Sequence, residues 1–366
     1  MYLTRLLQIK YFYTTISFLT NLSFRFIRRI KNKRKGGNVV IISLHRLGDS
    51  IFTIPAIKKI LNYHKENVSL ICFSETIDIF KITLNNINYV GLSHDDFYFT
   101  GRIASRNAKK QLKILDPGLI YDLTGCVTSA SMIYNSTAEI IIGINDNIYK
   151  SIYTCFIPKK IVDHITDIYN NVVTSLPELD NDNIISDTIT QGGLILIHPF
   201  AGWSAKEWGL NKFIELTLLL KKDYECSFIL PRGKIDKNTI NSMKNNGITF
   251  NITNNTGELI TTINKCSVFI GNDSGPVHIA NLLGKPTFTI YGPTNPAFHK
   301  PLSGKNNYII QRIKCSPGNG EKMCFTMGGQ IGCPSFECMN LLSVDQVKLE
   351  LEKFLSEIKL KAFQAK

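Results

Sequence analysis

Three loops in this sequence carry polar side chains that could do acid-base or anion-binding chemistry, and each follows a short apolar run. The first loop, residues 45–50, reads HRLGDS. Gly48 permits a tight turn, and Asp49 offers a carboxylate at the start of a predicted helix. Asp49 could act as a general base toward a bound hydroxyl group, or it could simply cap the helix. Residue type and spacing leave both interpretations open.

The second loop, residues 198–208, reads HPFAGWSAKEW. Gly202 and Ser204 offer a backbone donor and a hydroxyl donor, and Lys206 adds a positive charge. Together these groups are suited to holding a diphosphate. Trp208 fits an anchor in the hydrophobic core better than a residue that stacks on a ligand.

The third loop, residues 271–278, reads GNDSGPVH and leads into a predicted helix. Asp273 or Ser274 could cap this helix, and Gly275 keeps its first turn open, so that the helix N-terminus could bind an anion. His278 could face the same anion, although histidines are also common in protein cores. Each feature is weak alone, and their joint placement after strands is the stronger argument.

The elements that must position these loops alternate along the chain as strands and helices. Continuous apolar runs predict strands buried on both faces at residues 38–44, 68–73, 119–122, 140–144, 194–198, 226–230, 267–271 and 287–291. Helical patterns are expected at residues 210–220, 234–244, 276–283 and 343–361, and after the first strand in a helix that holds Pro55 in its first turn. In parallel α/β sheets ligands bind outside the carboxyl ends of the strands, which is where all three loops fall.

The length of 366 residues favours two domains, and a polar, turn-rich linker at residues 177–193 separates two series of strands and helices. The predicted fold is α/β, with two Rossmann-like domains that face each other across a cleft. The expected parts are a basic tail (1–37), an N-terminal domain (38–180), a C-terminal domain (190–342) and a C-terminal helix (343–366).

The net charge of +13 comes mostly from the first tenth of the chain. Residues 1–37 hold nine Lys or Arg and no acidic residue, whereas the rest carries 33 basic and 29 acidic side chains, which argues against a nucleic-acid-binding body. Apolar residues recur at helical spacing in this tail, and basic residues cluster toward its end: Phe12, Ile16, Leu19, Leu22, Phe26 and Ile30; Arg25, Arg28, Arg29, Lys31 and Lys33.

This pattern is typical of a helix that lies on an anionic membrane surface. The longest uncharged run, residues 11–24, is 14 residues long, shorter than a spanning helix needs. We therefore predict peripheral attachment to a membrane. The alternatives are a solvated basic helix and a secretory signal, although the sequence shows no clear cleavage site.

Nine cysteines, an odd number in a long chain, indicate a reducing cytosol rather than a disulfide scaffold. Four of them are grouped, at Cys315, Cys324, Cys333 and Cys338, but only the last pair approaches the usual zinc-ligand spacing. We predict no metal site and regard these thiols as structural or surface groups. No GxGxxG follows the first strand and no GxxxxGK[ST] occurs, so a dinucleotide-dependent dehydrogenase or a P-loop NTPase gains no support.

Four segments in order resemble the glycosyltransferase family that includes the ADP-heptose:lipopolysaccharide heptosyltransferases, glycosyltransferase family 9. They are HRLGDSIFTIPAIKKI, HPFAGWSAKEWGLNKF, NDSGPVHIANLLGKPTFTIYGPTNP and the cysteine-rich stretch that ends in CMNLLSV, together spanning about residues 38–350. The resemblance implies a GT-B fold, an inverting transfer from a nucleotide sugar, and work on the inner core of lipopolysaccharide at the cytoplasmic face of the inner membrane.

The resemblance also implies roles for individual residues. Asp49 matches the proposed catalytic base and Lys206 the phosphate-binding lysine. Asp273, Ser274, Gly275 and His278 match the segment that wraps the nucleotide diphosphate and sugar, and Gly202 and Ser204 lie in the second donor loop. The sequence departs from the family at Ala201 and Gly202, where some members have hydroxyl residues, and at residues 251–257, which are shortened.

The expected reaction therefore needs no cofactor, with ADP-heptose as co-substrate and a lipid-linked oligosaccharide as acceptor. The expected location is cytoplasmic and peripheral on the inner membrane. Three alternatives stay open: a GT-B enzyme that uses another nucleotide sugar for capsule or O-chain, a nucleotide-sugar epimerase, and a non-catalytic sugar-nucleotide binder.

Overall fold

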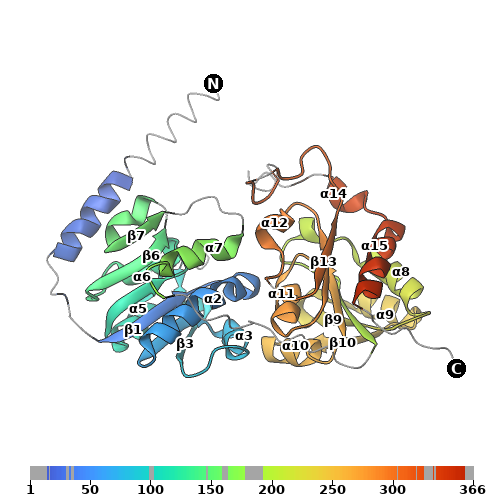
Figure 1. Cartoon of the computed structure of the whole chain (residues 1–366), viewed down its shortest axis with the longest axis horizontal. Coiled ribbons are helices and arrows are strands. Elements are labelled where there is room, and N and C mark those ends of the chain that lie inside the picture. Colours follow the sequence, from blue (N-terminus) through green and yellow to red (C-terminus); the bar gives the residue numbers. More distant parts are fainter. Residues whose placement is uncertain are drawn as a thin grey trace. The chain divides into compact units, whose positions relative to one another are not determined.

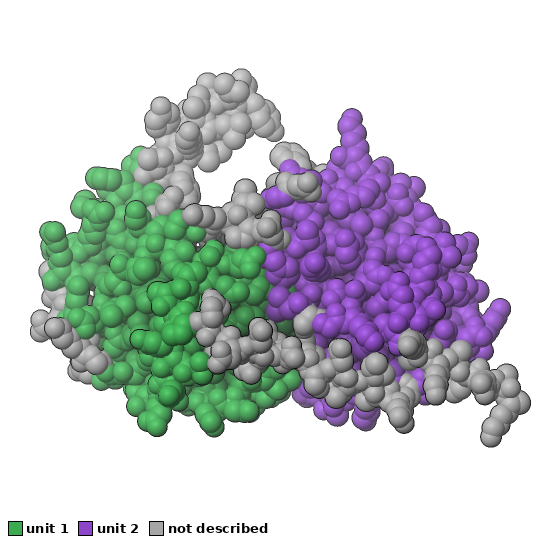
Figure 2. Space-filling model, viewed as in Figure 1, with its two compact units in different colours: residues 1–160, 166–180 green, residues 161–165, 181–366 purple. Residues whose placement is uncertain are grey.

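The computed structural model describes residues 15, 17–29, 33, 37–98, 103–145, 147–158, 164–177, 193–302, 304–318, 320–324, 333 and 335–358. The chain divides into two compact units, residues 1–160 with 166–180 and residues 161–165 with 181–366 (Figure 2). The predicted linker at residues 177–193 lies outside the described residues except for its two ends. Among the helices that the structure describes, none combines the length and the apolarity of a membrane span.

Unit 1 is built on a parallel sheet, which has six strands in the described part of the chain, in the order β3-β2-β1-β5-β6-β7 (Figure 1). The central strand β1 pairs with β2 on one side and with β5 on the other. Its residues are almost entirely buried, which explains the uninterrupted apolar run NVVIIS. The strands are β1 (Asn38–Ser43), β2 (Val68–Phe73), β3 (Asn88–Leu92), β5 (Pro117–Asp122), β6 (Ile140–Asn145) and β7 (Cys155–Pro158), with a short β4 (Ile103–Ala104) outside the sheet.

From β1 onward, helices alternate with strands in the described part of unit 1. They are α2 (Leu47–His64), α3 (Ile77–Lys81), α5 (Arg106–Ile114), α6 (Val127–Ile133) and α7 (Ile165–Asn170), the last of which begins at the boundary between the units. The prediction that Pro55 occupies the first turn of its helix is wrong, because α2 begins at Leu47 and Pro55 lies inside it. Ile57 and Ile60 are fully buried on the face that packs on the sheet, and this burial offsets the hydrogen bond that proline removes.

Unit 2 repeats the design with the strand order β10-β9-β8-β11-β12-β13, again parallel throughout (Figure 1). The strands are β8 (Leu194–His198), β9 (Glu225–Pro231), β10 (Thr249–Thr253), β11 (Val268–Asn272), β12 (Thr287–Tyr291) and β13 (Asn306–Ile310). The helices are α8 (Leu210–Leu220), α9 (Lys237–Asn245), α10 (Thr256–Ile263), α11 (Gly275–Leu282), α12 (Pro296–His299), α14 (Glu337–Asn340) and α15 (Val344–Glu357).

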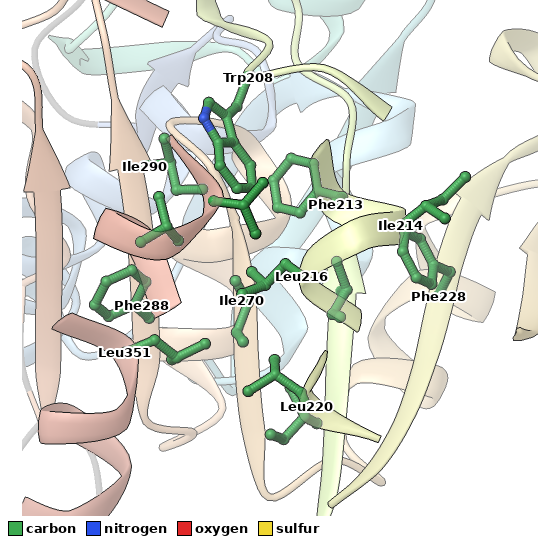
Figure 3. Close-up of a cluster of buried hydrophobic side chains, with 14 of the residues drawn as sticks. Trp208, Phe213, Ile214, Leu216, Leu220, Phe228, Ile270, Phe288, Ile290 and Leu351 are labelled. Carbon is green, nitrogen blue, oxygen red and sulfur yellow. The ribbon is translucent and has the colours of Figure 1, made fainter. Parts of the chain in front are cut away.

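One hydrophobic core of unit 2 lies between its sheet and the helices α8 and α15 (Figure 3). Phe213 and Leu216 of α8 meet Phe228, Ile270 and Phe288 of the strands, all of them fully buried. From α15, the buried side chains of Val347, Leu351, Phe354 and Leu355 join the same cluster. The C-terminal helix is therefore part of the core of unit 2.

Candidate functional site

In unit 2 the loops after β8 and β11 lie at the point where the strand order reverses. β8 pairs with β9 on one side and with β11 on the other, so the connections that leave these two central strands run in opposite directions along the sheet. Such a switch point leaves a crevice outside the carboxyl ends of the strands, which is the usual ligand site of an open α/β sheet. The second and third predicted loops thus flank one site although about 70 residues separate them.

A buried ion pair joins these two loops. The Lys206 Nζ donates to Asp273 Oδ2 at 2.7 Å, and the side chains are 17% and 4% exposed. Asp273 Oδ2 also accepts a hydrogen bond from Thr294 Oγ1 at 2.6 Å, and His278 Nε2 lies 3.8 Å from Asp273 Oδ1. Asp273 therefore orients Lys206, and its carboxylate is turned toward protein groups.

Electrostatics keep Asp273 ionised in spite of its burial. Loss of water opposes the charged form, but the ammonium group of Lys206 and the nearby imidazoles of His278 and His299 outweigh it and hold the pKa of Asp273 well below its usual range. An ammonium group has three donors, and the bond to Asp273 uses one. Lys206 can thus stay fixed by Asp273 and still donate to a bound phosphate.

Ser274 stands at the start of α11, but its side chain does not cap the helix as predicted. It occupies the N-cap position, but neither its side chain nor that of Asp273 caps the helix, so the capping interpretation of both residues is wrong. Ser274 is 9% exposed, and its Oγ has no hydrogen-bond partner among the described residues. A buried hydroxyl group that is left unpaired at a helix N-terminus is suited to donating to an anion.

A second set of contacts fixes the conformation of the loop after β8. Glu207 Oε1 accepts from the Ala201 backbone N–H at 2.9 Å and pairs with Lys234 Nζ at 2.7 Å. Gly202 and Ser204 are exposed on this loop, and an added Cβ at Gly202 would meet nothing within 4 Å. Their groups are therefore accessible to a ligand, as the sequence predicts for donor contacts.

Trp208 anchors the loop to the core. Its side chain is 2% exposed, its Nε1 donates to the Leu342 carbonyl oxygen at 2.9 Å, and its ring packs edge-on against Phe213. Its backbone N–H donates to Asn272 Oδ1 at the end of β11, which ties the two loops together. The prediction of a core anchor is confirmed.

The other tryptophan, Trp203, lies beside the ion pair. It is exposed, and the centroid of its ring lies 5.1 Å from Lys206 Nζ. The sequence pattern did not point to this residue.

Asp49 of unit 1 lies in the first turn of α2 and does not cap it. The N-cap residue is Arg46, which makes no side-chain cap hydrogen bond, so the capping interpretation of Asp49 is wrong. Asp49 is half-buried, and the Tyr169 hydroxyl is close enough that the Asp49 charge adds to the effect of burial in raising the pKa of Tyr169. The carboxylate is left available for other chemistry.

A buried carboxylate that the sequence analysis did not single out braces this loop. Asp122, at the end of β5, accepts hydrogen bonds from Tyr153 Oη at 2.6 Å, from Ser129 Oγ at 2.8 Å and from two backbone N–H groups of the next loop. That loop in turn holds the Asp49 loop, because Thr124 Oγ1 accepts from the Leu44 N–H and the Leu123 carbonyl oxygen lies 3.0 Å from His45 Nε2. β1 and β5 are adjacent, so Asp49 also lies at a switch point. Its position as the last residue of a buried strand is the signal that could have found Asp122.

The grouped cysteines line one cavity of about 30 Å³ behind the second loop, together with Ala205 and Pro293. All four thiols are free, and burial followed by the neighbouring thiols raises the pKa of Cys338 to about 11. Across the described residues, no three His, Cys, Asp or Glu side chains are grouped closely enough to hold a metal ion.

Comparison with known proteins finds similarity to one family in the part of the chain that holds the second and third loops. The model described as glycosyltransferase family 9 (heptosyltransferase) matches residues 176–326. Lipooligosaccharide heptosyltransferase 2 of Campylobacter jejuni is 29% identical over 168 residues, which cover 43% of this chain and 50% of the relative. The chain thus spans about half the length of the curated relative that it matches.

Solved structures share the fold over most of the chain. The glycosyl transferase family 9 structure from Veillonella parvula has a TM-score of 0.68 at 16% identity and covers 88% of this chain and 98% of its own. The E. coli ADP-heptose lps heptosyltransferase II has a TM-score of 0.65 at 15% identity, with coverage of 88% and 99%.

The fold is therefore that of the GT-B glycosyltransferases, built from two Rossmann-like units, and this part of the sequence prediction is confirmed. The resemblance to glycosyltransferase family 9 is confirmed as well, by the family model and by the heptosyltransferase relatives.

Proposed function

We propose that this chain is an inverting glycosyltransferase that transfers a heptose from ADP-heptose to a lipid-linked acceptor of the lipopolysaccharide core. The observation that carries the proposal is the arrangement at the β8/β11 switch point, where Lys206 is fixed by Asp273 beside the unpaired Ser274 hydroxyl and the N-terminus of α11. It lies within the segment that the family model matches. The named donor and acceptor rest on the relatives, whose printed names include heptose transfer.

In the proposed reaction the acceptor oxygen forms a bond to the anomeric carbon while the bond from that carbon to the diphosphate oxygen breaks. The bonding electrons leave with ADP, and the acceptor hydroxyl loses its proton. Asp49 takes this proton as general base. Lys206, Ser274 and the N-terminus of α11 stabilise the charge that grows on the departing diphosphate.

The other predicted residues support this donor site. Asp273 and His278 act as positioning residues for Lys206, and Gly202, Ser204 and Gly275 leave room and donors for the diphosphate. The proposal requires no cofactor beyond the nucleotide sugar. Because the acceptor is lipid-linked, it includes a peripheral location at the cytoplasmic face of the inner membrane.

A panel of nucleotide sugars tests the function. The purified chain is incubated with ADP-heptose or other nucleotide sugars and with a core acceptor that lacks heptose, and nucleotide release, product mass and anomeric configuration are measured. We expect transfer from ADP-heptose with inversion at the anomeric carbon. Transfer from another nucleotide sugar alone would replace the donor, and donor binding without turnover would favour a non-catalytic binder.

Ser274 provides a separate test of the donor site. Ser274→Ala removes a hydroxyl group that makes no cap bond, so we expect the melting temperature to stay near that of the wild type. A hydrogen bond to a charged phosphate is worth about 1.5–3 kcal/mol, so ADP affinity is expected to fall about tenfold or more. Calorimetric titration with ADP measures it.

Thr289→Val is the matched control, because Thr289 Oγ1 in β12 is equally buried and without a hydrogen-bond partner among the described residues. It should change neither stability nor ADP affinity by much. Equal ADP affinity in Ser274→Ala and in the wild type would remove the Ser274 hydroxyl from the proposed site.

A further inference from the structure

The helix of residues 17–29, drawn in dark blue at the N-terminal end in Figure 1, is fixed to unit 1 by one of its faces. On this inner face the Phe24 ring packs against Tyr134 and Tyr149, with ring centroids 6.0 and 6.5 Å apart. Asn21 Oδ1 accepts from the Ser151 N–H at 2.8 Å, and Arg28 Nη2 donates to the Ala138 carbonyl oxygen at 3.1 Å. These contacts turn the Arg28 side chain toward the protein.

The opposite face of the same helix is apolar and uncovered. Phe18, Leu19, Leu22 and Phe26, the outer face, are 67%, 55%, 55% and 64% exposed. Phe18 and Leu19 lie four and three residues before Leu22, and Phe26 lies four residues after it, so the four side chains form one continuous row. Single exposed apolar side chains are ordinary, but a contiguous row of four marks an interaction surface. The row contains three residues of the predicted apolar stripe, whereas Phe12, Ile16 and Ile30 lie outside the described residues.

Charge decides which partner this outer face suits. Residues 1–37 hold nine basic residues and no acidic one, and Arg25, Arg29 and Lys33 are exposed within or beside the helix. A second copy of the chain would bring two such sets of like charge together, which opposes a dimer through this face. An anionic lipid surface attracts the exposed charges of Arg25, Arg29 and Lys33, each by about 1 kcal/mol, and accepts apolar side chains below its headgroups.

We infer that the helix of residues 17–29 is a fixed membrane-binding element, in which the outer face enters an anionic leaflet while the inner face stays bound to unit 1. The helix needs no release from the protein to bind lipid, so the enzyme would rest on the membrane through unit 1. The inference deepens the proposed peripheral location and does not depend on which sugar is transferred.

Vesicle co-sedimentation of the full chain tests this inference. The outer-face variant replaces Phe18, Leu19, Leu22 and Phe26 by glutamine. The matched control replaces four apolar side chains of similar exposure elsewhere, Tyr63, Ile114, Leu341 and Leu349, by glutamine. With vesicles of phosphatidylcholine containing phosphatidylglycerol, we expect the partition coefficient of the outer-face variant to fall at least about tenfold, and that of the control to stay near wild type.

Binding to the anionic vesicles should also weaken in high salt, and vesicles of phosphatidylcholine alone should bind less. Wild-type binding by the outer-face variant would overturn the inference, as would a dimer in lipid-free solution that this variant abolishes.

A second variant, Leu22→Trp, provides a test that does not depend on whether the fourfold variant folds stably. Its added fluorescence should shift to the blue with anionic vesicles, and an unchanged spectrum would contradict insertion. Turnover on a soluble acceptor fragment should persist in the outer-face variant, which separates this test from the test of the transferase function.

Discussion

Replacing Asp49 by asparagine is expected to reduce glycosyl transfer by about 10²–10⁴-fold, the usual cost of losing a general base. The side chain keeps its shape but can no longer take the acceptor's proton. Because Asp49 does not cap α2, the substitution removes only its favourable interaction with the helix N-terminus, about 0.3–1 kcal/mol. The melting temperature and ADP affinity should therefore stay near wild type while turnover collapses.

Asp345→Asn is the matched control for Asp49→Asn, because Asp345 is also an acid in the first turn of a helix, α15. Both variants should lose a similar small amount of stability, and only Asp49→Asn should lose turnover. Turnover near wild type in Asp49→Asn would show that another group accepts the proton.

Lys206→Ala is expected to impair both stability and catalysis. Removing one partner of a buried ion pair costs up to about 3–5 kcal/mol, because the remaining charge is left buried, although Thr294 still donates to Asp273. Since the charge on the leaving diphosphate grows in the transition state, loss of the ammonium group should lower kcat as well as raise the KM for the donor. Denaturant unfolding and steady-state kinetics measure the two effects.

The double variant Lys206→Ala/Asp273→Asn separates the structural contribution from the catalytic one. It leaves no buried charge unpaired, and the asparagine oxygen can still accept from Thr294, so the free energy of unfolding should recover in part. Turnover should stay low, because no ammonium group faces the donor. Recovery of kcat together with stability would show that Lys206 acts only through the fold.

The central strands could be predicted from the sequence because they are buried on both faces. β2, β8 and β12 have the predicted bounds, and their residues are almost all buried, so each appears as an uninterrupted apolar run. The edge strands β3, β7, β10 and β13 were not predicted. Most of their positions are exposed or half-buried, and several of these strands contain polar residues such as those of TFNIT and NNYII, so their pattern does not differ clearly from that of a loop.

Helix boundaries were less accessible to sequence reasoning. α8 has the predicted bounds, because its apolar spacing and flanking residues agree. The start of α2 and the roles of Asp49 and Ser274 as caps were wrong, since capping depends on the backbone angles and the side-chain orientation at one residue. Residue type alone does not specify either.

By itself the sequence determined that two series of strands and helices form parallel sheets, and that the loops around Asp49, Lys206 and Asp273 follow their strands. These are local properties, set by apolar runs and by turn residues. Only the tertiary structure decided that Asp273 pairs with Lys206, 67 residues earlier, and accepts from Thr294, 21 residues later. It also decided that the Ser274 hydroxyl is buried with no hydrogen-bond partner among the described residues. Such contacts depend on which strands become neighbours in the sheet, and that order is a property of the whole packed unit rather than of any one segment.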